Sequence, residues 1–209
     1  MYERYRLVPL TARGSYPGDV ATNARERLLD TAEDLFYAQG TRGTGIEQIL
    51  QVSGVGRASF YRHFASKGDL VLAFLARRRA QWEDVFVPTV RARGGHPLDV
   101  YDELAVRLER TSYRGCSFIN TLVELPDPAD PAHQMAVAQK ERMRAFFGEL
   151  LAEQGYADDD GSLARQLLLL YDGASVTGVR ERSPRAAHDA RAMAEALLAA
   201  APRAVPAGG

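Results

Sequence analysis

Residues 46–64 read IEQILQVSGVGRASFYRHF and carry the most informative pattern in the sequence. Apolar residues recur at helical spacing on both sides of its centre: Ile46, Ile49, Leu50, Phe60 and Phe64. Between them, the sequence SGVG places two glycines within three residues, which ends a helix and permits the positive φ angle of a tight turn. The pattern predicts two short helices, over residues 44–53 and 57–64, joined by a glycine turn.

The second of these helices has two contrasting sides. At 100° per residue, Phe60 and Phe64 point in one direction and would pack inward. The opposite side and its flanks carry small, hydroxylated, cationic or aromatic residues: Ala58, Ser59, Tyr61, Arg62 and His63. Such side chains suit the base edges and phosphates of DNA, and a helix-turn-helix places its second helix in the major groove. An ordinary solvated face of a small helical bundle would look similar.

Capping signals extend the helical pattern toward the N-terminus. Asn23 and Glu26 have the spacing of a capping box and predict a helix from residue 23 that Gly40 ends. Thr44 and Glu47 repeat the spacing at the start of the next helix. Three helices therefore precede residue 66.

The remaining sequence also predicts helices. Ser66 caps a longer helix that Pro88 would stop after residue 87. Five more are predicted over about residues 97–110, 116–125, 131–155, 162–180 and 184–201. No segment shows the alternation that is typical of a strand. The prediction is an all-α fold of about nine helices.

Composition excludes several classes of protein. With 46% hydrophobic and 25% charged residues, the chain has ordinary globular values. A single cysteine, Cys116, rules out a disulfide framework, and no uncharged apolar run is long enough to span a membrane. We therefore expect a cytoplasmic protein.

Charge is unevenly distributed along the chain. Residues 1–80 hold 12 basic and 8 acidic side chains, whereas residues 81–209 hold 14 basic and 19 acidic ones. A basic first third suggests that this end meets a polyanion, although a difference of this size also arises by chance.

The motifs together resemble a known family. The matching residues are ARERLLDTAEDLF at 24–36, Gly40, the stretch 46–64, Ser66-Lys67 and Leu70. They resemble the DNA-binding domain of the TetR family of bacterial repressors. The resemblance implies a symmetric homodimer with an N-terminal helix-turn-helix and a larger helical domain that binds a small molecule and releases DNA. It also implies DNA contacts by Thr44, Arg57, Ala58, Ser59, Tyr61, Arg62, His63 and Lys67.

Domain boundaries follow from combining the helices with the resemblance. We expect a flexible extension over residues 1–22, a helix-turn-helix domain over 23–68, a ligand-binding and dimerisation domain over 69–201, and a tail over 202–209. The extension carries interleaved arginines and tyrosines, so a DNA-contacting arm is an alternative to a flexible leader or a mis-assigned start.

The C-terminal half resembles certain family members through residues 115–120, 124–128 and 167–173. The family places its ligand pocket among the middle helices, where we expect the following residues to line it: Trp82, Phe86, Tyr101, Leu104, Phe118, Asn120, Glu124, Phe146, Tyr171 and Asp172. Aromatic residues on helix stripes also form ordinary cores. A carboxylate within apolar sequence needs a partner, which for Glu124 and Asp172 is a cationic ligand, Arg114 or a helix amide.

The last two helices are the expected dimer interface. Residues 167–170 are apolar on all sides, and small residues follow at 173–175 and 178. Two such helices from each subunit would form a four-helix bundle.

The predicted function is a ligand-responsive repressor that binds a palindromic DNA operator. A non-specific DNA-binding protein is the nearest alternative, and a small-molecule enzyme is a distant one. The sequence contains no phosphate-binding glycine motif and no nucleophile elbow. The four histidines are scattered, so neither a metal nor a cofactor is expected.

Overall fold

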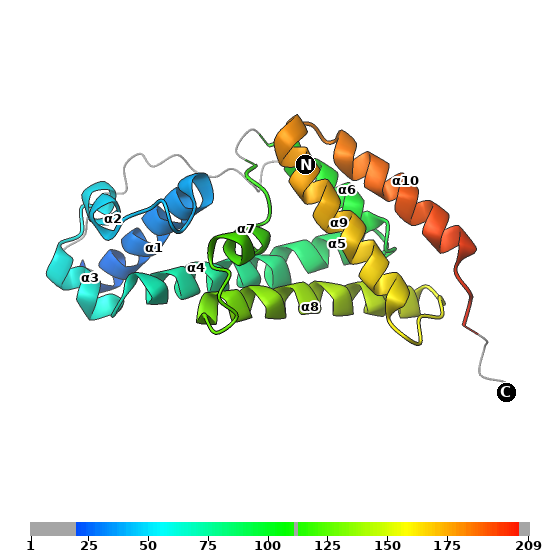
Figure 1. Ribbon diagram of the computed structural model, residues 1–209, viewed down its shortest axis with the longest axis horizontal. Coiled ribbons are helices and arrows are strands. Elements are labelled where there is room, and N and C mark those ends of the chain that lie inside the picture. Colours follow the sequence, from blue (N-terminus) through cyan, green and yellow to red (C-terminus); the bar gives the residue numbers. More distant parts are fainter. Residues whose placement is uncertain (1–19, 111–112, 205–209) are drawn as a thin grey trace.

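The computed structural model describes residues 20–110 and 113–204, with side chains from residue 24 onward. This part of the chain forms ten α-helices and one π-helical turn (Figure 1). Their bounds are α1 (Val20–Gln39), α2 (Ile46–Ser53), α3 (Arg57–His63), α4 (Lys67–Gln81), the π turn η1 (Trp82–Phe86), α5 (Val87–Arg93), α6 (Asp99–Leu108), α7 (Ser117–Glu124), α8 (Pro131–Glu153), α9 (Ser162–Glu181) and α10 (Arg185–Ala200). No strand occurs among these residues, and the predicted all-α fold is confirmed.

The molecule is elongated and has two hydrophobic cores (Figure 1). The N-terminal core joins α1, α2 and α3 to the first half of α4, and it includes Phe118 of α7 and Ala136 of α8. The C-terminal core joins η1 and α5 to α6, α8, α9 and α10 around Tyr101 and Phe147. Helix α8 contributes to both cores, whereas α4, which packs against α8, contributes to the N-terminal core and leads through η1 into the C-terminal one. They are therefore the elements that connect the two halves.

Two of the expected N-terminal caps are wrong. Helix α1 begins at Val20, so Asn23 lies inside its first turn. Helix α2 begins after Gly45, which has extended backbone and makes no side-chain cap, so Thr44 does not cap it. The cap of α4 is confirmed, because the Ser66 hydroxyl accepts a hydrogen bond from the Asp69 amide at 3.1 Å.

Pro88 does not stop the helical path. The Val87 amide bonds to the Trp82 carbonyl across a π turn, and the path continues as α5 to residue 93. Pro88 lies in the first turn of α5, where the amide that it lacks is not needed. The Thr89 hydroxyl donates to the Val85 carbonyl at 2.6 Å. The segment expected as one helix over residues 66–87 is thus divided, which accounts for ten helices instead of about nine.

None of the described helices has the length and hydropathy needed to cross a membrane.

Candidate functional site

Helices α2 and α3 form the expected helix-turn-helix. Gly54 has a φ of +64°, and its amide bonds to the Leu50 carbonyl at 3.0 Å, which ends α2. The Val55 amide donates to the Ser53 hydroxyl at 3.3 Å. Arg27 of α1 donates to the Ser53 carbonyl and so fixes the end of α2 against α1. The turn is therefore held by its own backbone and by a neighbouring helix.

The predicted phase of the recognition helix α3 is confirmed. Phe60 and Phe64 are buried in the N-terminal core, with ring centroids 6.1 Å apart. Most predicted DNA-contacting residues of α3 are exposed (Arg57, Ala58, Tyr61 and Arg62), and Ser59 and His63 are half-buried. The fold thus presents a mixed cationic, hydroxylated and aromatic face.

Thr44 does not belong to this exposed face. Its side chain is fully buried, and its hydroxyl donates to the Gly40 carbonyl at 2.8 Å. The resemblance places Thr44 at the DNA, but its side chain is not on the exposed face of the structure. The threonine stabilises the connection between α1 and α2 from the inside.

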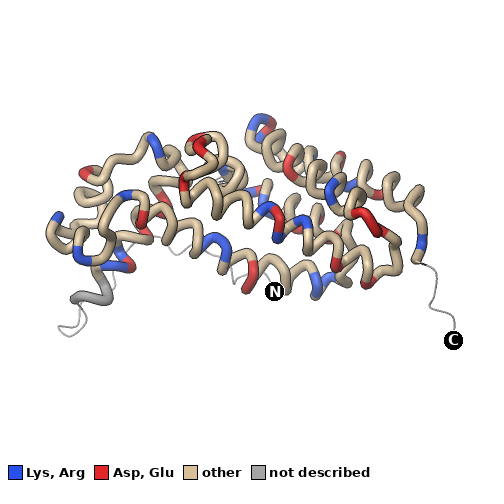
Figure 2. Tube along the Cα trace, turned by 60° about the horizontal axis from the view of Figure 1, so that its bottom comes forward, with Lys and Arg blue, Asp and Glu red and all other residues tan. Residues whose placement is uncertain are grey.

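Lys67 lies at the first position of α4, beside the recognition helix. It is half-buried, and burial lowers the pKa of its ammonium, an effect that the charge of Glu124 partly offsets. The surrounding end of the molecule carries several Lys and Arg residues (Figure 2). One of them, Arg57, is paired with Glu47 of α2. This pairing orients the guanidinium at the start of the recognition helix.

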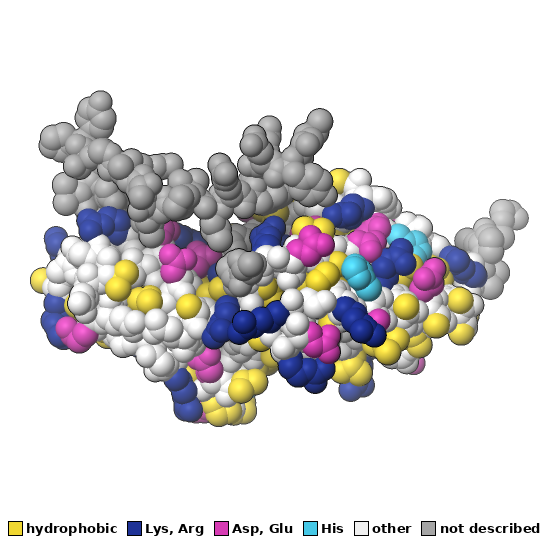
Figure 3. Space-filling model, turned by 90° about the horizontal axis from the view of Figure 1, so that it is seen from above, with side chains coloured by type: hydrophobic (Ala, Val, Ile, Leu, Met, Phe, Trp, Pro, Cys, Tyr) yellow, Lys and Arg dark blue, Asp and Glu magenta, His cyan; other side chains and the backbone are white. Residues whose placement is uncertain are grey.

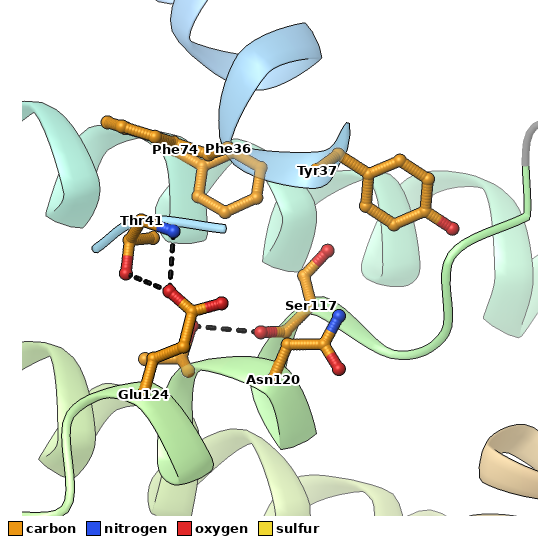
Figure 4. Close-up of a pocket in the computed structure, with 8 residues that line it drawn as sticks. Phe36, Tyr37, Thr41, Phe74, Ser117, Asn120 and Glu124 are labelled. Atoms are coloured by element: carbon orange, nitrogen blue, oxygen red, sulfur yellow. Dashed lines mark hydrogen bonds between the residues drawn. The ribbon is translucent and has the colours of Figure 1, made fainter. Parts of the chain in front are cut away.

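Glu124 of α7 holds the connection between α1 and α2 (Figure 4). One oxygen, Oε2, accepts hydrogen bonds from the Thr41 amide at 2.5 Å, the Thr41 hydroxyl at 2.6 Å and the Arg42 amide at 3.0 Å. Gly40 has a φ of +83°, which favours glycine, and a Cβ atom there would come within 2.5 Å of the other oxygen of Glu124. We call this contact the Glu124 latch. It joins the larger helical part directly to the segment that precedes α2.

A second polar contact lies at the end of α1. The Tyr37 hydroxyl accepts from the Arg114 amide at 2.9 Å and donates to the Gly115 carbonyl at 3.2 Å. Asn120 of α7 donates to the Arg114 carbonyl at 3.1 Å. Together with the Glu124 latch, these residues surround a small cavity with room for about one water molecule (Figure 4).

The ten residues expected to line one ligand pocket lie in two places. Three belong to the contact just described or to the N-terminal core: Phe118, Asn120 and Glu124. The other seven lie in or beside the C-terminal core: Trp82, Phe86, Tyr101, Leu104, Phe146, Tyr171 and Asp172. The ten residues are therefore divided between two places in the structure. For Glu124, the partners are the amides and hydroxyl of a loop rather than a helix amide, a ligand or Arg114.

Most of the C-terminal group is packed as core. Trp82 meets Phe146 edge-on at 5.7 Å, and Phe86 meets Tyr171 edge-on at 6.3 Å. The fully buried Tyr101 hydroxyl donates to the Leu167 carbonyl at 2.7 Å. Burial raises the pKa values of both tyrosines, so they remain neutral.

Polar side chains separate the two cores. Arg78 of α4, Gln139 and Lys140 of α8, and Asp172 of α9 form what we call the polar layer. On α8, Gln139 and Lys140 fall between a residue of the N-terminal core and one of the C-terminal core. Lys140 is paired with Asp172, and burial raises the pKa of that carboxyl despite the lysine. Gln139 is only 1% exposed, and neither polar atom of its amide has a partner.

Sequence reasoning missed three members of this layer: Arg78, Gln139 and Lys140. The apolar positions of α8, at residues 132, 136, 143 and 147, put Gln139 and Lys140 on the same buried face. Helical phase could therefore have identified both residues. Their neighbours across the layer come from other helices, which the sequence pattern does not reveal.

Comparisons with known proteins agree with this arrangement. The family model described as "Bacterial regulatory proteins, tetR family" matches residues 28–74. A TetR-family transcriptional regulator from Streptomyces coelicolor has a solved structure that is 34% identical, with a TM-score of 0.75 over 86% of this chain and 96% of that one. A TetR regulator from Streptomyces avermitilis is 31% identical, with a TM-score of 0.72 over 85% of this chain and 97% of that one.

A curated relative extends the match. The HTH-type transcriptional regulator TtgR of Pseudomonas putida is 29% identical over 187 residues, covering 78% of this chain and 88% of its own length. The chain therefore belongs to the TetR family of DNA-binding transcriptional regulators, which are not enzymes.

Proposed function

We propose that the protein is a ligand-responsive repressor that binds a palindromic operator as a homodimer and is released by a small-molecule effector. The observation that carries the proposal is the exposed outer face of α3 over the buried Phe60 and Phe64. We assign DNA binding to residues 23–68, and effector binding and dimerisation to residues 69–201. Residues 1–19 of the expected extension and residues 205–209 of the expected tail lie outside the described residues. Binding to the chromosome requires a cytoplasmic location.

The outer face of α3 supports sequence-specific binding. Arg62 lies opposite the buried phenylalanines, where a guanidinium can bond two acceptors of one guanine. The proposed contacts are Arg57, Ala58, Ser59, Tyr61, Arg62, His63 and Lys67. A few exposed side chains on a rigid helix suit base readout better than a diffuse basic surface would.

Exposed apolar side chains support the dimer. Leu169 is 72% exposed and Val176 56% exposed on one side of α9, and Met193 is 58% exposed on α10. Hydrophobic side chains are visible at the surface over this end of the molecule (Figure 3). Two recognition helices must meet half-sites about 34 Å apart, which a single copy with one recognition helix does not do. We place the interface on these outer faces, because Leu198 and Ala194 of α10 are already buried within the chain.

Helix α4 supports the response to an effector. Its first residue lies beside the recognition helix, and its other end leads into Trp82 and Phe86 of the C-terminal core. An effector that prefers a different packing of α4 and α8 would shift the population toward a form with mis-spaced recognition helices. Operator affinity would then fall by about 5- to 150-fold.

An operator selection from random duplexes, followed by titration, tests the proposal. We expect a palindromic consensus bound at least about 1,000-fold more tightly than a scrambled duplex at physiological salt. Equal affinity for both duplexes would favour the non-specific alternative and reject sequence-specific repression.

A further inference from the structure

Three residues along α4, η1 and α8 bury side-chain polar atoms that have no partner. Among the described residues, four buried side-chain atoms lack a hydrogen-bond partner: Arg78 Nε, Trp82 Nε1, and both Nε2 and Oε1 of Gln139. A buried polar group that is left unpaired costs stability, so native proteins retain few of them. Arg78 and Trp82 lie one turn apart on the path from α4 into η1, and Gln139 lies on α8, which packs against α4.

Gln139 is the centre of this group. It lies on the buried face of α8 between Ala136 of the N-terminal core and Met143 of the C-terminal core. Both neighbours are apolar, and an apolar residue would satisfy the packing at this position. The amide instead offers a donor and an acceptor side by side, and both are unused. A molecule with the complementary pair could bond both atoms at once.

The surroundings indicate an aromatic and uncharged partner. Trp82 packs on Phe86 at 6.4 Å and edge-on against Phe146 at 5.7 Å, and Phe146 lies two turns beyond Gln139 on α8. The charges of the layer are already matched, since Lys140 pairs with Asp172 and Arg78 pairs with Glu33 at 3.3 Å. A charged ligand would find no free counter-ion among these residues.

Trp82 provides a route for entry. Its side chain is half-buried, and it is the first residue of the π turn η1. Such turns interrupt an α-helix and occur frequently at functional sites. Entry at this ring requires the Trp82 side chain to move, because it packs on Phe86 and Phe146.

We infer that the polar layer binds a neutral, flat aromatic molecule with an adjacent hydrogen-bond donor and acceptor, as in a lactam, which pairs with the side-chain amide of Gln139. This inference rests on the proposed function, because it names the chemical class of the effector. Trp82 Nε1 donates to a further acceptor of the same molecule.

The probes that test the inference are 2-quinolone, a bicyclic lactam, and naphthalene, which has the same shape without the polar pair. Trp82 is the only tryptophan, so the full-length protein gives a single indole signal in a ¹H–¹⁵N TROSY spectrum. We expect 2-quinolone to shift that signal and to bind at least tenfold more tightly than naphthalene, because a site built for hydrogen bonds rejects an analogue without them. Equal affinities, or no shift up to the solubility limit, would overturn the inference.

Two variants locate the binding. Gln139→Met keeps the side-chain volume and removes the amide. We expect this variant to bind 2-quinolone at least tenfold more weakly and to change the affinity for naphthalene less than twofold. Gln134→Met makes the same substitution at an exposed position of α8 and should change neither. If Gln139→Met binds 2-quinolone like the unaltered protein, Gln139 is only a structural residue. If that variant does not fold, the affinities of the unaltered protein for the two probes still test the inference.

Operator binding separates this inference from the proposed function. A protein that binds its operator specifically but does not prefer the lactam rejects the ligand class and leaves repression intact. A protein that binds no operator specifically rejects the proposed function, whatever the probes do.

Discussion

The two ends of α4 lie in regions of opposite character. At the N-terminal end, Ser66 caps the helix, Phe60 and Phe64 fill the core beside it, and no buried side-chain polar atom of the described residues of α1, α2 and α3 lacks a partner. At the other end, Arg78 and Trp82 each bury an unpaired N–H group, and a π turn follows. In the DNA-binding end, the buried side-chain polar atoms of these helices have hydrogen-bond partners. In the polar layer, some buried donors and acceptors have none.

The end that binds DNA is also attached firmly to α4. Arg77 bonds Asp30 at 2.5 Å, Glu26 at 2.6 Å and Glu33 at 3.3 Å, all on α1. The arginine side chain is only 23% exposed, so this network is less screened than a surface pair. A displacement of α4 would therefore carry α1 with it.

The largest effect is expected at the dimer surface, on which both regions depend. Leu169→Glu puts a charge on an exposed apolar position of α9, and we expect it to give monomers and to weaken operator binding by about 10²- to 10⁴-fold. Sedimentation together with an operator titration measures both effects. Val137→Glu, at an exposed apolar position of α8 outside the proposed interface, is the control, and a dimeric Leu169→Glu would place the interface elsewhere.

Breaking the Glu124 latch tests whether α7 holds the segment between α1 and α2. Glu124→Gln removes the charge that Thr41 and Arg42 bond, and such bonds contribute about 1.5–3 kcal/mol each. We expect faster hydrogen exchange at the Thr41 and Arg42 amides and a lower Tm. The matched variant Glu141→Gln, on the surface of α8, should alter neither. Unchanged exchange at residues 41 and 42 would show that the latch does not hold this segment.

Substitution of Arg62 tests whether the exposed face of α3 reads the bases of the operator. Arg62→Ala should reduce discrimination between operator and scrambled duplex by about 1–3 kcal/mol. Arg142→Ala, an exposed arginine on α8, serves as the control. Discrimination that survives the Arg62 substitution would remove this residue from base readout.

The smallest effect on DNA binding is expected from the substitution of Lys67. Lys67→Ala is expected to lower operator and scrambled affinities alike and to reduce the slope of log affinity against log salt by about one unit. Titrations at several salt concentrations provide the slope. An unchanged slope would mean that the partly desolvated ammonium does not meet a phosphate.

The contrast between the regions also explains what the sequence could predict. The orientation of α3 follows from Phe60 and Phe64, because one helix and its period determine which side is buried. The burial of Thr44 could not be read in the same way, since a capping threonine and a buried one have the same local pattern. Glu124 and Asp172 were expected to need partners, but Thr41 and Lys140 come from distant segments that only the fold brings together.

On α8, helical phase predicts which residues are buried but not which partners they meet. It places Gln139 on the buried face, but the absence of a partner depends on what α4 brings opposite. Packing between helices therefore defines the polar layer, whereas the recognition face is defined within one helix.

The most direct test of the account is whether the two ends of α4 are coupled. The dissociation constant of 2-quinolone, read from the indole signal of Trp82, is measured for the free protein and for its complex with the selected operator. We predict that operator weakens the binding of 2-quinolone by about 5- to 150-fold, and that 2-quinolone weakens the binding of operator by the same factor, because linkage is reciprocal. The same affinity for 2-quinolone with and without operator would contradict this coupling, since the DNA-binding end and the polar layer would then act independently.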